Sequence, residues 1–279
     1  MRVLIIGGTG LLGKALVREW GSDEVVAMGS HDVDVRDAAA VMRIVEGVHP
    51  DWVVLAAAYT DVDGCESNQE LAFAVNRDGA ANVAQAARRS GAKLLFLSSD
   101  YVFDGKKASP YEADDRRNPQ SVYGRSKAEA ETSLLGIVPG VCIVRTSWVF
   151  GIGGRCFPDT ILRLGESRPS LDVVNDQRGC PTYTVDLARA IIQLCHKNAG
   201  GIVHVTNAGN CSWYEFAKEI IIRAGLNTEV KPVRTEQMPR PAQRPAYSVL
   251  SGASLHGYHM EMPSWKDALD RYLVERGVG

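Results

Sequence analysis

The sequence has no excess of charge of either sign and no long apolar run. Its 279 residues include 31 Lys and Arg against 33 Asp and Glu, which gives a formal net charge of -2 at pH 7. This balance leaves no basic surface for nucleic acid or for an anionic membrane. No apolar stretch reaches the ~18 residues of a membrane-spanning helix, and the first residues form no basic, hydrophobic leader. We therefore expect a cytoplasmic protein that binds neither nucleic acid nor membrane.

The cysteines are few and scattered. Six occur, with no C-x-x-C pair and no His/Cys ligand spacing, so we expect neither a metal site nor a disulfide framework. They are Cys65, Cys142, Cys156, Cys180, Cys195 and Cys211. Because 45% of the residues are hydrophobic, the chain can bury a substantial core.

A glycine-rich turn follows the first apolar run. Arg2–Ile6 is short and apolar, as expected of a strand buried on both faces of a parallel sheet. A helix that starts after such a turn directs free N–H groups at a pyrophosphate. The pattern predicts a dinucleotide site, although a generic strand–turn–helix with glycines used only for loop geometry is the alternative. The site would comprise Gly7, Thr9, Gly10, Leu11, Leu12 and Gly13.

Strand and helix patterns alternate through the first half of the chain. This alternation predicts an α/β fold with a doubly wound parallel sheet (Rossmann) over residues 1–150. Prolines then break the regularity, so we expect a smaller substrate-binding lobe over 151–279, with segments crossing back to the first domain. The expected strands are 2–6, 24–28, 52–57, 93–98, 141–145, 202–205 and 230–233, and the expected helices include 38–47, 71–90, 122–135 and 213–224.

A tyrosine and a lysine are placed four residues apart in Tyr123-Gly124-Arg125-Ser126-Lys127. This spacing puts both side chains on one face of a helix. A phenol has a pKa of about 10, and a nearby ammonium lowers it. Ser99, at the end of a predicted strand, is suited to orient a substrate carbonyl. With the glycine turn, this pattern predicts a nicotinamide-dependent oxidoreductase with Tyr123 as its acid, whereas the spacing alone also fits an ordinary tyrosine and a surface lysine.

The second strand ends without an acidic residue. It reads Ala27-Met28-Gly29-Ser30-His31, and an Asp or Glu there would bind the adenosine ribose and repel a 2′-phosphate. With Ser30 and His31 as expected phosphate contacts, the sequence favours NADPH and leaves NADH use open.

Several longer blocks resemble the dTDP-4-dehydrorhamnose reductases, which are extended short-chain dehydrogenase/reductases. The most specific is the run from Ser98 to Gly105, which is similar to their S-[ST]-D-Y-V-F-D-G. Leu55–Glu66 is similar to N-A-A-A-Y-T-x-V-D-x-x-E, with Leu55 in place of the Asn. Further matches are 145–150 with R-T-S-W-V-[FY], 175–182 with N-D-Q-x-G-x-P-T and 244–250 with R-P-x-x-S-x-L. The resemblance extends from residue 1 to about residue 273.

The resemblance implies a role for each matching residue. Tyr123 would be the proton donor, Lys127 its electrostatic partner and Ser99 the hydroxyl that tunes the site. The residues implied along the dinucleotide are Ala56, Ala57, Ala58 and Thr60, with Asp34 and Val35 beside the adenine. Those implied at the substrate are Asp100, Tyr101 and Trp148 against the deoxyhexose and Arg244 on the diphosphate.

The expected reaction is therefore reduction of the C4 keto group of dTDP-4-dehydro-6-deoxy-L-mannose with NAD(P)H, giving dTDP-L-rhamnose. The expected partner is a dTDP-sugar, and a homodimer remains open. Two alternatives remain open as well. One is another nucleotide-sugar reductase or epimerase on the same scaffold. The other is a cofactor-binding regulatory subunit similar to the β subunit of methionine adenosyltransferase.

Overall fold

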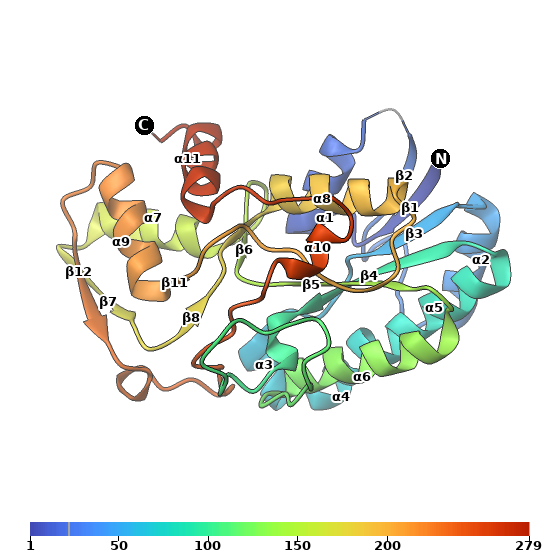
Figure 1. Cartoon of the computed structure of the whole chain (residues 1–279), viewed down its shortest axis with the longest axis horizontal. Helices are drawn as coiled ribbons and strands as arrows, with labels where there is room; N and C mark the ends of the chain where they lie inside the picture. The colour runs from blue at the N-terminus through green and yellow to red at the C-terminus, as the bar shows by residue number, and fades with distance from the viewer. Residues whose placement is uncertain (22, 279) are drawn as a thin grey trace.

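The centre of the computed structural model, which describes residues 1–21 and 23–278, is a six-stranded parallel sheet (Figure 1). The strand order is β10-β5-β4-β3-β1-β2, and every neighbouring pair is parallel. The strands are β1 (Arg2–Ile6), β2 (Glu24–Met28), β3 (Trp52–Leu55), β4 (Lys93–Ser99), β5 (Cys142–Thr146) and β10 (Gly201–His204).

Helices cover both faces of this sheet (Figure 1). One face carries α1 (Leu11–Glu19) and α8 (Thr184–His196), and the other carries α2 (Ala38–Val48), α5 (Gly79–Ser90) and α6 (Val122–Ile137). Successive strand residues point to opposite faces: in β1, Val3 and Ile5 join the first core, whereas Leu4 and Ile6 join the second. Both faces are therefore buried, which confirms the predicted doubly wound α/β class.

The helix predicted over 71–90 is interrupted. The structure has α4 (Gln69–Phe73), then a π-helical turn at Ala74–Asp78, and only then α5. Asn76 in this turn is buried, and its side chain bonds both the N–H and the C=O of Tyr59, at 2.8 and 3.1 Å. Its amide also donates to the Ser126 hydroxyl at 3.0 Å. The wider turn thus accompanies an inward-facing amide, which helical periodicity alone does not reveal.

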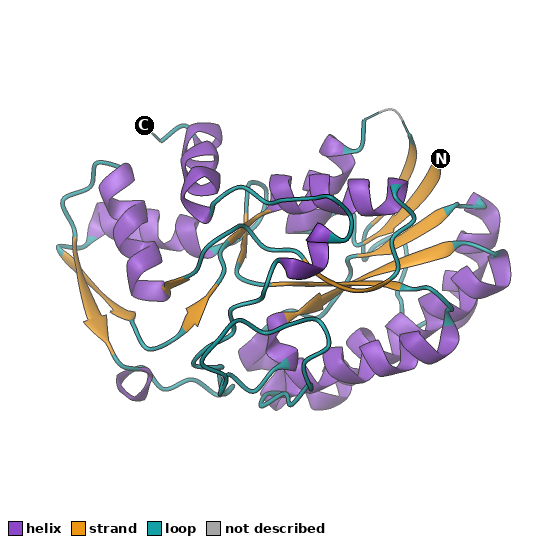
Figure 2. Cartoon of the chain, viewed as in Figure 1, coloured by secondary structure: helices purple, strands orange, loops and turns teal. Residues whose placement is uncertain are grey.

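Most of the remaining elements in the second half of the chain gather around a core of their own (Figure 2). Phe150 lies in this core, and its ring contacts Phe216 and Tyr272 at centroid distances of 5.5 and 5.4 Å. Its main elements are α7 (Phe157–Ser167), α9 (Trp213–Arg223), α11 (Trp265–Arg276) and the parallel pair β7 (Ser170–Val174) and β12 (Glu229–Val233).

Besides α8, which covers one face, a strand of the second half joins the central sheet. The strand expected at 202–205 is β10, which pairs with β5 at the edge of the six-stranded sheet. The smaller elements are α3 (Val62–Ser67), α10 (Ala253–His256), and the two-residue strands β6 (Val149–Phe150), β8 (Arg178–Gly179), β9 (Thr182–Tyr183) and β11 (Cys211–Ser212). The division into domains at residue 150 stays a prediction.

Within the described residues, no helix is both long and apolar enough to cross a membrane.

Candidate active site

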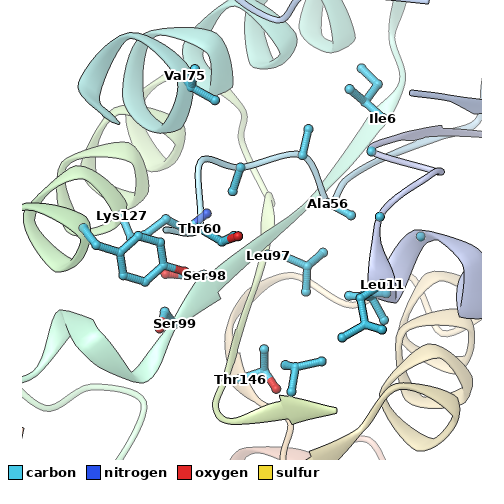
Figure 3. A pocket seen from close by; sticks show the side chains of 18 of the residues that line it. Ile6, Leu11, Ala56, Thr60, Val75, Leu97, Ser98, Ser99, Lys127 and Thr146 are labelled. Atoms are coloured by element: carbon cyan, nitrogen blue, oxygen red, sulfur yellow. The ribbon is translucent and has the colours of Figure 1, made fainter. Parts of the chain in front are cut away.

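A cavity of about 850 Å³ lies at the carboxyl ends of the central strands (Figure 3). β2 lies on one side of β1 and β3 lies on the other, so the strand order reverses at β1, and the cavity opens at this point. Ligands bind at such reversals of strand order in open α/β sheets. The predicted site residues that line it are Gly7, Thr9, Gly10, Leu11, Leu12, Gly13, Ser30, Asp34, Val35, Ala56, Ala57, Ala58, Thr60, Ser99, Asp100, Tyr101, Tyr123, Lys127 and Trp148.

The glycine turn leaves the start of α1 open to the cavity. Gly7 has φ +100°, a conformation that strongly favours glycine. A Cβ on Gly13 would lie 2.1 Å from the Gly7 carbonyl oxygen, so only glycine lets α1 pack this closely. No side chain caps the first turn of α1, whose N-cap is Gly10. Its free N–H groups and positive dipole end therefore fit a pyrophosphate, and the cradle fits a dinucleotide.

Helix α6 presents Tyr123 and Lys127 to the same cavity as Ser99, the last residue of β4. The helix begins after Ser121, whose hydroxyl accepts a hydrogen bond from the backbone of the first turn. In Figure 3, Ser99 and Lys127 lie on one side of the cavity and Leu11 on the opposite side. The structure therefore brings the three predicted catalytic residues together.

The pKa values of Tyr123 and Lys127 are not shifted as the sequence suggests, where the ammonium was expected to lower the pKa of the phenol. Burial raises the pKa of Tyr123, and the influence of the Ser99 hydroxyl only partly opposes this shift. Burial also lowers the pKa of Lys127 to about 7, with the Glu131 carboxylate opposing this shift. The Lys127 ammonium lies 4.0 Å from the ring centroid of Phe96. Desolvation is the largest influence on the pKa of each group, so the phenol is protonated at neutral pH and suited to act as an acid.

Two buried oxygens at the cavity have no partner among the described residues: Asp100 Oδ2 and Thr146 Oγ1. The other Asp100 oxygen accepts from the Ser99 hydroxyl at 2.9 Å. Burial raises the pKa of Asp100 to about 6, although the Ser248 and Ser99 hydroxyls act to lower it. Buried polar atoms nearly always have partners, so these two oxygens are suited to hydroxyl groups of a ligand.

A pair of stacked indoles forms another wall of the cavity. The rings of Trp148 and Trp213 are parallel within 7°, with centroids 3.4 Å apart. Trp148 has φ +45°, a left-handed conformation that is strained for a bulky residue. A Cβ on Gly179 would lie 2.5 Å from the Trp148 ring, so the ring needs glycine at that position. Trp213 is the first residue of α9, so this stack joins the two halves of the chain.

Two predicted site residues do not line the cavity: His31, which is exposed, and Arg244. The Arg244 guanidinium makes two hydrogen bonds of 3.0 Å to the carboxylate of Asp63. Arg240 approaches the same carboxylate at 3.5 Å. Arg244 also lies close enough to Tyr101 to lower the pKa of that phenol, although burial raises it more. Its assignment to a diphosphate stays a prediction.

Sequence reasoning missed six lining residues with polar or aromatic side chains: Arg36, Ser98, Thr146, Ser147, Arg155 and Trp213. Arg36 is half-exposed and pairs with Asp34 at 2.6 Å. Its place directly after the predicted site residues Asp34 and Val35 was an available signal. Thr146 ends β5 and was available by the same rule that selected Ser99. For Arg155 and Trp213 the sequence carries no comparable signal, because they come from the second half of the chain.

Comparison with known proteins identifies the family to which this site belongs. Residues 1–277 match the family model described as RmlD substrate binding domain. The chain is 41% identical to the spore coat polysaccharide biosynthesis protein SpsK of Bacillus subtilis, over 99% of this chain and 98% of that protein. It is 40% identical to dTDP-4-dehydrorhamnose reductase of Mycobacterium tuberculosis, over 90% of this chain and 84% of that protein.

A solved structure matches over nearly the full length. The crystal structure of dTDP-4-dehydrorhamnose reductase from Bacillus anthracis in complex with NADP superposes with a TM-score of 0.96 at 38% identity. The match covers 98% of this chain and 99% of that one.

The raised pKa of Asp100 predicts a specific pH dependence of stability. The folded state keeps the proton up to about pH 6, whereas an unfolded aspartate loses it near pH 4. The folded state binds more protons in between, so this group lowers stability as pH rises from about 4 to about 6. Asp100→Asn removes this titration. We therefore expect the free energy of unfolding of the variant, relative to that of the wild type, to rise by roughly 1–3 kcal/mol between about pH 4 and about pH 6. Urea unfolding at several pH values measures it.

Asp104 supplies the matched control, because its pKa is shifted in the other direction. Burial tends to raise it, but hydrogen bonds from Asn118, the Lys106 backbone and Tyr111 lower it overall. Asp104→Asn should therefore lose stability relative to the wild type as pH rises. If the stability of both variants relative to the wild type changed in the same direction as pH rises, the raised pKa of Asp100 would be wrong.

Proposed function

The chain belongs to the RmlD substrate binding domain family, and on that premise we propose that it is an NADPH-dependent dTDP-4-dehydrorhamnose reductase. It reduces the C4 keto group of dTDP-4-dehydro-6-deoxy-L-mannose and gives dTDP-L-rhamnose. The observation that carries the proposal is the meeting of Ser99, Tyr123 and Lys127 in a cavity that continues to the uncapped start of α1. NADPH is supported by the NADP complex of the Bacillus anthracis relative, and NADH use stays open.

Each of the three residues has a distinct task in this reduction. The protonated phenol of Tyr123 donates its proton to the C4 oxygen. Lys127 lies one helical turn away on the same face, and its ammonium stabilises the phenolate that Tyr123 becomes. Ser99, whose hydroxyl acts to lower the pKa of Tyr123, orients the carbonyl oxygen. The reduced nicotinamide supplies the hydride when bound, and the turn Gly7–Gly13 holds the dinucleotide's phosphates.

The substrate end of the cavity fits a sugar nucleotide. The unpartnered oxygens of Asp100 and Thr146 are suited to sugar hydroxyls, and the Trp148 indole offers apolar surface to a deoxyhexose ring. We assign Arg244 to the substrate diphosphate, because guanidinium groups bind phosphates in a bidentate way. The bound diphosphate then takes over from Asp63 as the partner of Arg244.

We place the enzyme in the cytoplasm. All six cysteines are buried as free thiols. Free thiols suit a compartment that keeps cysteines reduced.

The direct test is NADPH oxidation in the presence of dTDP-4-keto-6-deoxy-L-hexose, with the C4 configuration of the product assigned by NMR. We expect turnover and dTDP-L-rhamnose as the product. A different C4 configuration would indicate another nucleotide-sugar reductase. Tight NADPH binding without turnover would indicate a regulatory subunit.

Tyr123→Phe removes the proton donor but keeps the ring. We expect turnover to fall by at least ~10²-fold, the usual contribution of a general acid, with NADPH affinity nearly unchanged. Steady-state kinetics and a calorimetric titration with NADPH measure the two effects. Wild-type turnover in this variant would remove Tyr123 from the mechanism.

Arg36→Gln tests the adenosine end of the cavity. Because Arg36 is the cation beside Asp34, we expect it to bind the 2′-phosphate. The variant should bind NADPH about 10-fold more weakly, as a hydrogen bond between charged groups predicts. NADH, which lacks that phosphate, should bind as in the wild type. Equal weakening for both cofactors would place Arg36 elsewhere on the dinucleotide.

Arg244→Ala tests the diphosphate assignment. We expect the KM for the sugar nucleotide to rise at least 10-fold, since charged hydrogen bonds contribute about 1.5–3 kcal/mol. Cofactor affinity should not change, because the cofactor's pyrophosphate lies on the glycine turn. Arg240→Ala is the control: it removes the more exposed cation from the same Asp63 carboxylate. Equal effects of the two substitutions would indicate general electrostatic attraction.

A further inference from the structure

The carboxylate of Glu131 is fully buried one helical turn after Lys127 on α6. Its Oε1 accepts from the Ser98 hydroxyl at 2.5 Å and from Arg145 Nε at 2.9 Å. Its Oε2 accepts from Arg145 Nη2 at 2.7 Å and from Arg117 Nη1 at 3.1 Å. These four hydrogen bonds, three of them from guanidinium groups, occupy both oxygens.

The partners of this carboxylate belong to separate elements of the site. Ser98 lies in β4 directly before Ser99, and Arg145 lies in β5 directly before Thr146. Neighbouring strand residues point to opposite faces. A bond from Glu131 to each of these strands therefore fixes α6 relative to the strand ends that carry Ser99 and Thr146. In Figure 3, Ser98 lies next to Ser99 below α6.

The same carboxylate sets the charge near Lys127. Burial lowers the pKa of Lys127, and Glu131 is the acid that opposes this effect. Arg145 and Arg117 bring two positive charges to the one negative charge of Glu131. The charged and titratable groups packed around this region are Glu131 and Tyr123 of α6, Asp100 after β4, Arg145 of β5, His204 of β10, Arg117 before α6 and Cys65 of α3.

We propose that Glu131 is a positioning residue of this reductase: it fixes α6 against the ends of β4 and β5 and holds the Lys127 ammonium in its charged form. The proposal deepens the proposed function and rests on Lys127 being part of its site. It also assigns the opposite influence to Arg117, whose side chain is 26% exposed and whose guanidinium brings positive charge to the same carboxylate.

Two substitutions separate this electrostatic role from a purely structural one. Glu131→Gln keeps the size and removes the negative charge, whereas Arg117→Gln removes a positive charge from the same cluster. Both variants lose an ion pair, so both should have a lower midpoint of thermal unfolding. The protonation midpoint of Lys127 should nevertheless move in opposite directions, down by about one pH unit in Glu131→Gln and up in Arg117→Gln. A structural role alone predicts no such opposition.

The control is Glu129→Gln, an identical charge change two residues earlier on α6. Glu129 is 49% exposed and pairs with Arg77 at the surface, where solvent screens its charge. We expect the Lys127 midpoint to stay within about 0.2 pH unit of the wild type. A shift as large as that of Glu131→Gln would overturn the proposal, because overall charge would then explain the result.

The readout is NMR of the protein labelled with ¹³C at the lysine ε carbon, titrated with pH in the absence of cofactor. Lys127→Arg identifies the signal. Opposite shifts in the two variants support the proposal. Shifts of the same sign, or none in folded protein, overturn it. If Glu131→Gln does not fold, Arg117→Gln decides alone: an upward shift supports the proposal and its absence overturns it.

Kinetics provide the link to the reaction and separate this proposal from the function itself. Reduction needs Lys127 charged, so the alkaline limb of the kcat/KM profile should move with the NMR midpoint in each variant. If no variant and no wild-type sample turns over the dTDP-sugar while the NMR midpoints still shift, the proposed function is wrong and the role of Glu131 stands. If the dTDP-sugar is turned over while the midpoints stay unchanged, the role of Glu131 is wrong and the proposed function stands.

Discussion

The packing of α6 against the carboxyl ends of β4 and β5 is the contact on which the candidate site depends. The helix carries the phenol and the ammonium, and the strands end in Ser99 and Thr146. A parallel sheet covered on both faces leaves its strand ends as the accessible polar edge. A rotation of α6 would separate Tyr123 and Lys127 from Ser99. Burial of the polar groups that join helix and strands therefore specifies the geometry rather than adding much to stability.

Much of the first half of the fold follows from the sequence. The apolar runs that became β1, β3, β4 and β5 are almost entirely buried, so their pattern carries strong information. The interruption at Ala74–Asp78 could not be predicted, because it accompanies a side-chain contact between Asn76 and Tyr59 that lies outside helical periodicity. β10 could be predicted as a strand but not as a neighbour of β5, since partner choice depends on contacts far apart in the sequence.

Some residues of the candidate site could be predicted from local sequence motifs, whereas others are placed only by packing between distant segments. Glycines, Tyr123 and Lys127 are tied to local motifs, and they line the cavity as predicted. Trp213 reaches the cavity only through the packing of α9, and Arg244 is held by Asp63, which is distant in sequence. The pKa shifts were also inaccessible: the sequence suggests attraction between ammonium and phenol, whereas the fold adds desolvation, which dominates for both groups.

The dependence of Trp148 on Gly179 has a consequence for any attempt to change sugar preference by design. The indole occupies the space that a side chain at position 179 would fill, and its backbone is held at φ +45°. A smaller residue at 148 would open a gap beside Gly179 as well as beside Trp213, and a larger residue at 179 would displace the indole into the cavity. Libraries that vary position 148 alone would therefore sample mostly damaged sites. Positions 148, 179 and 213 form one design unit and need to be varied jointly.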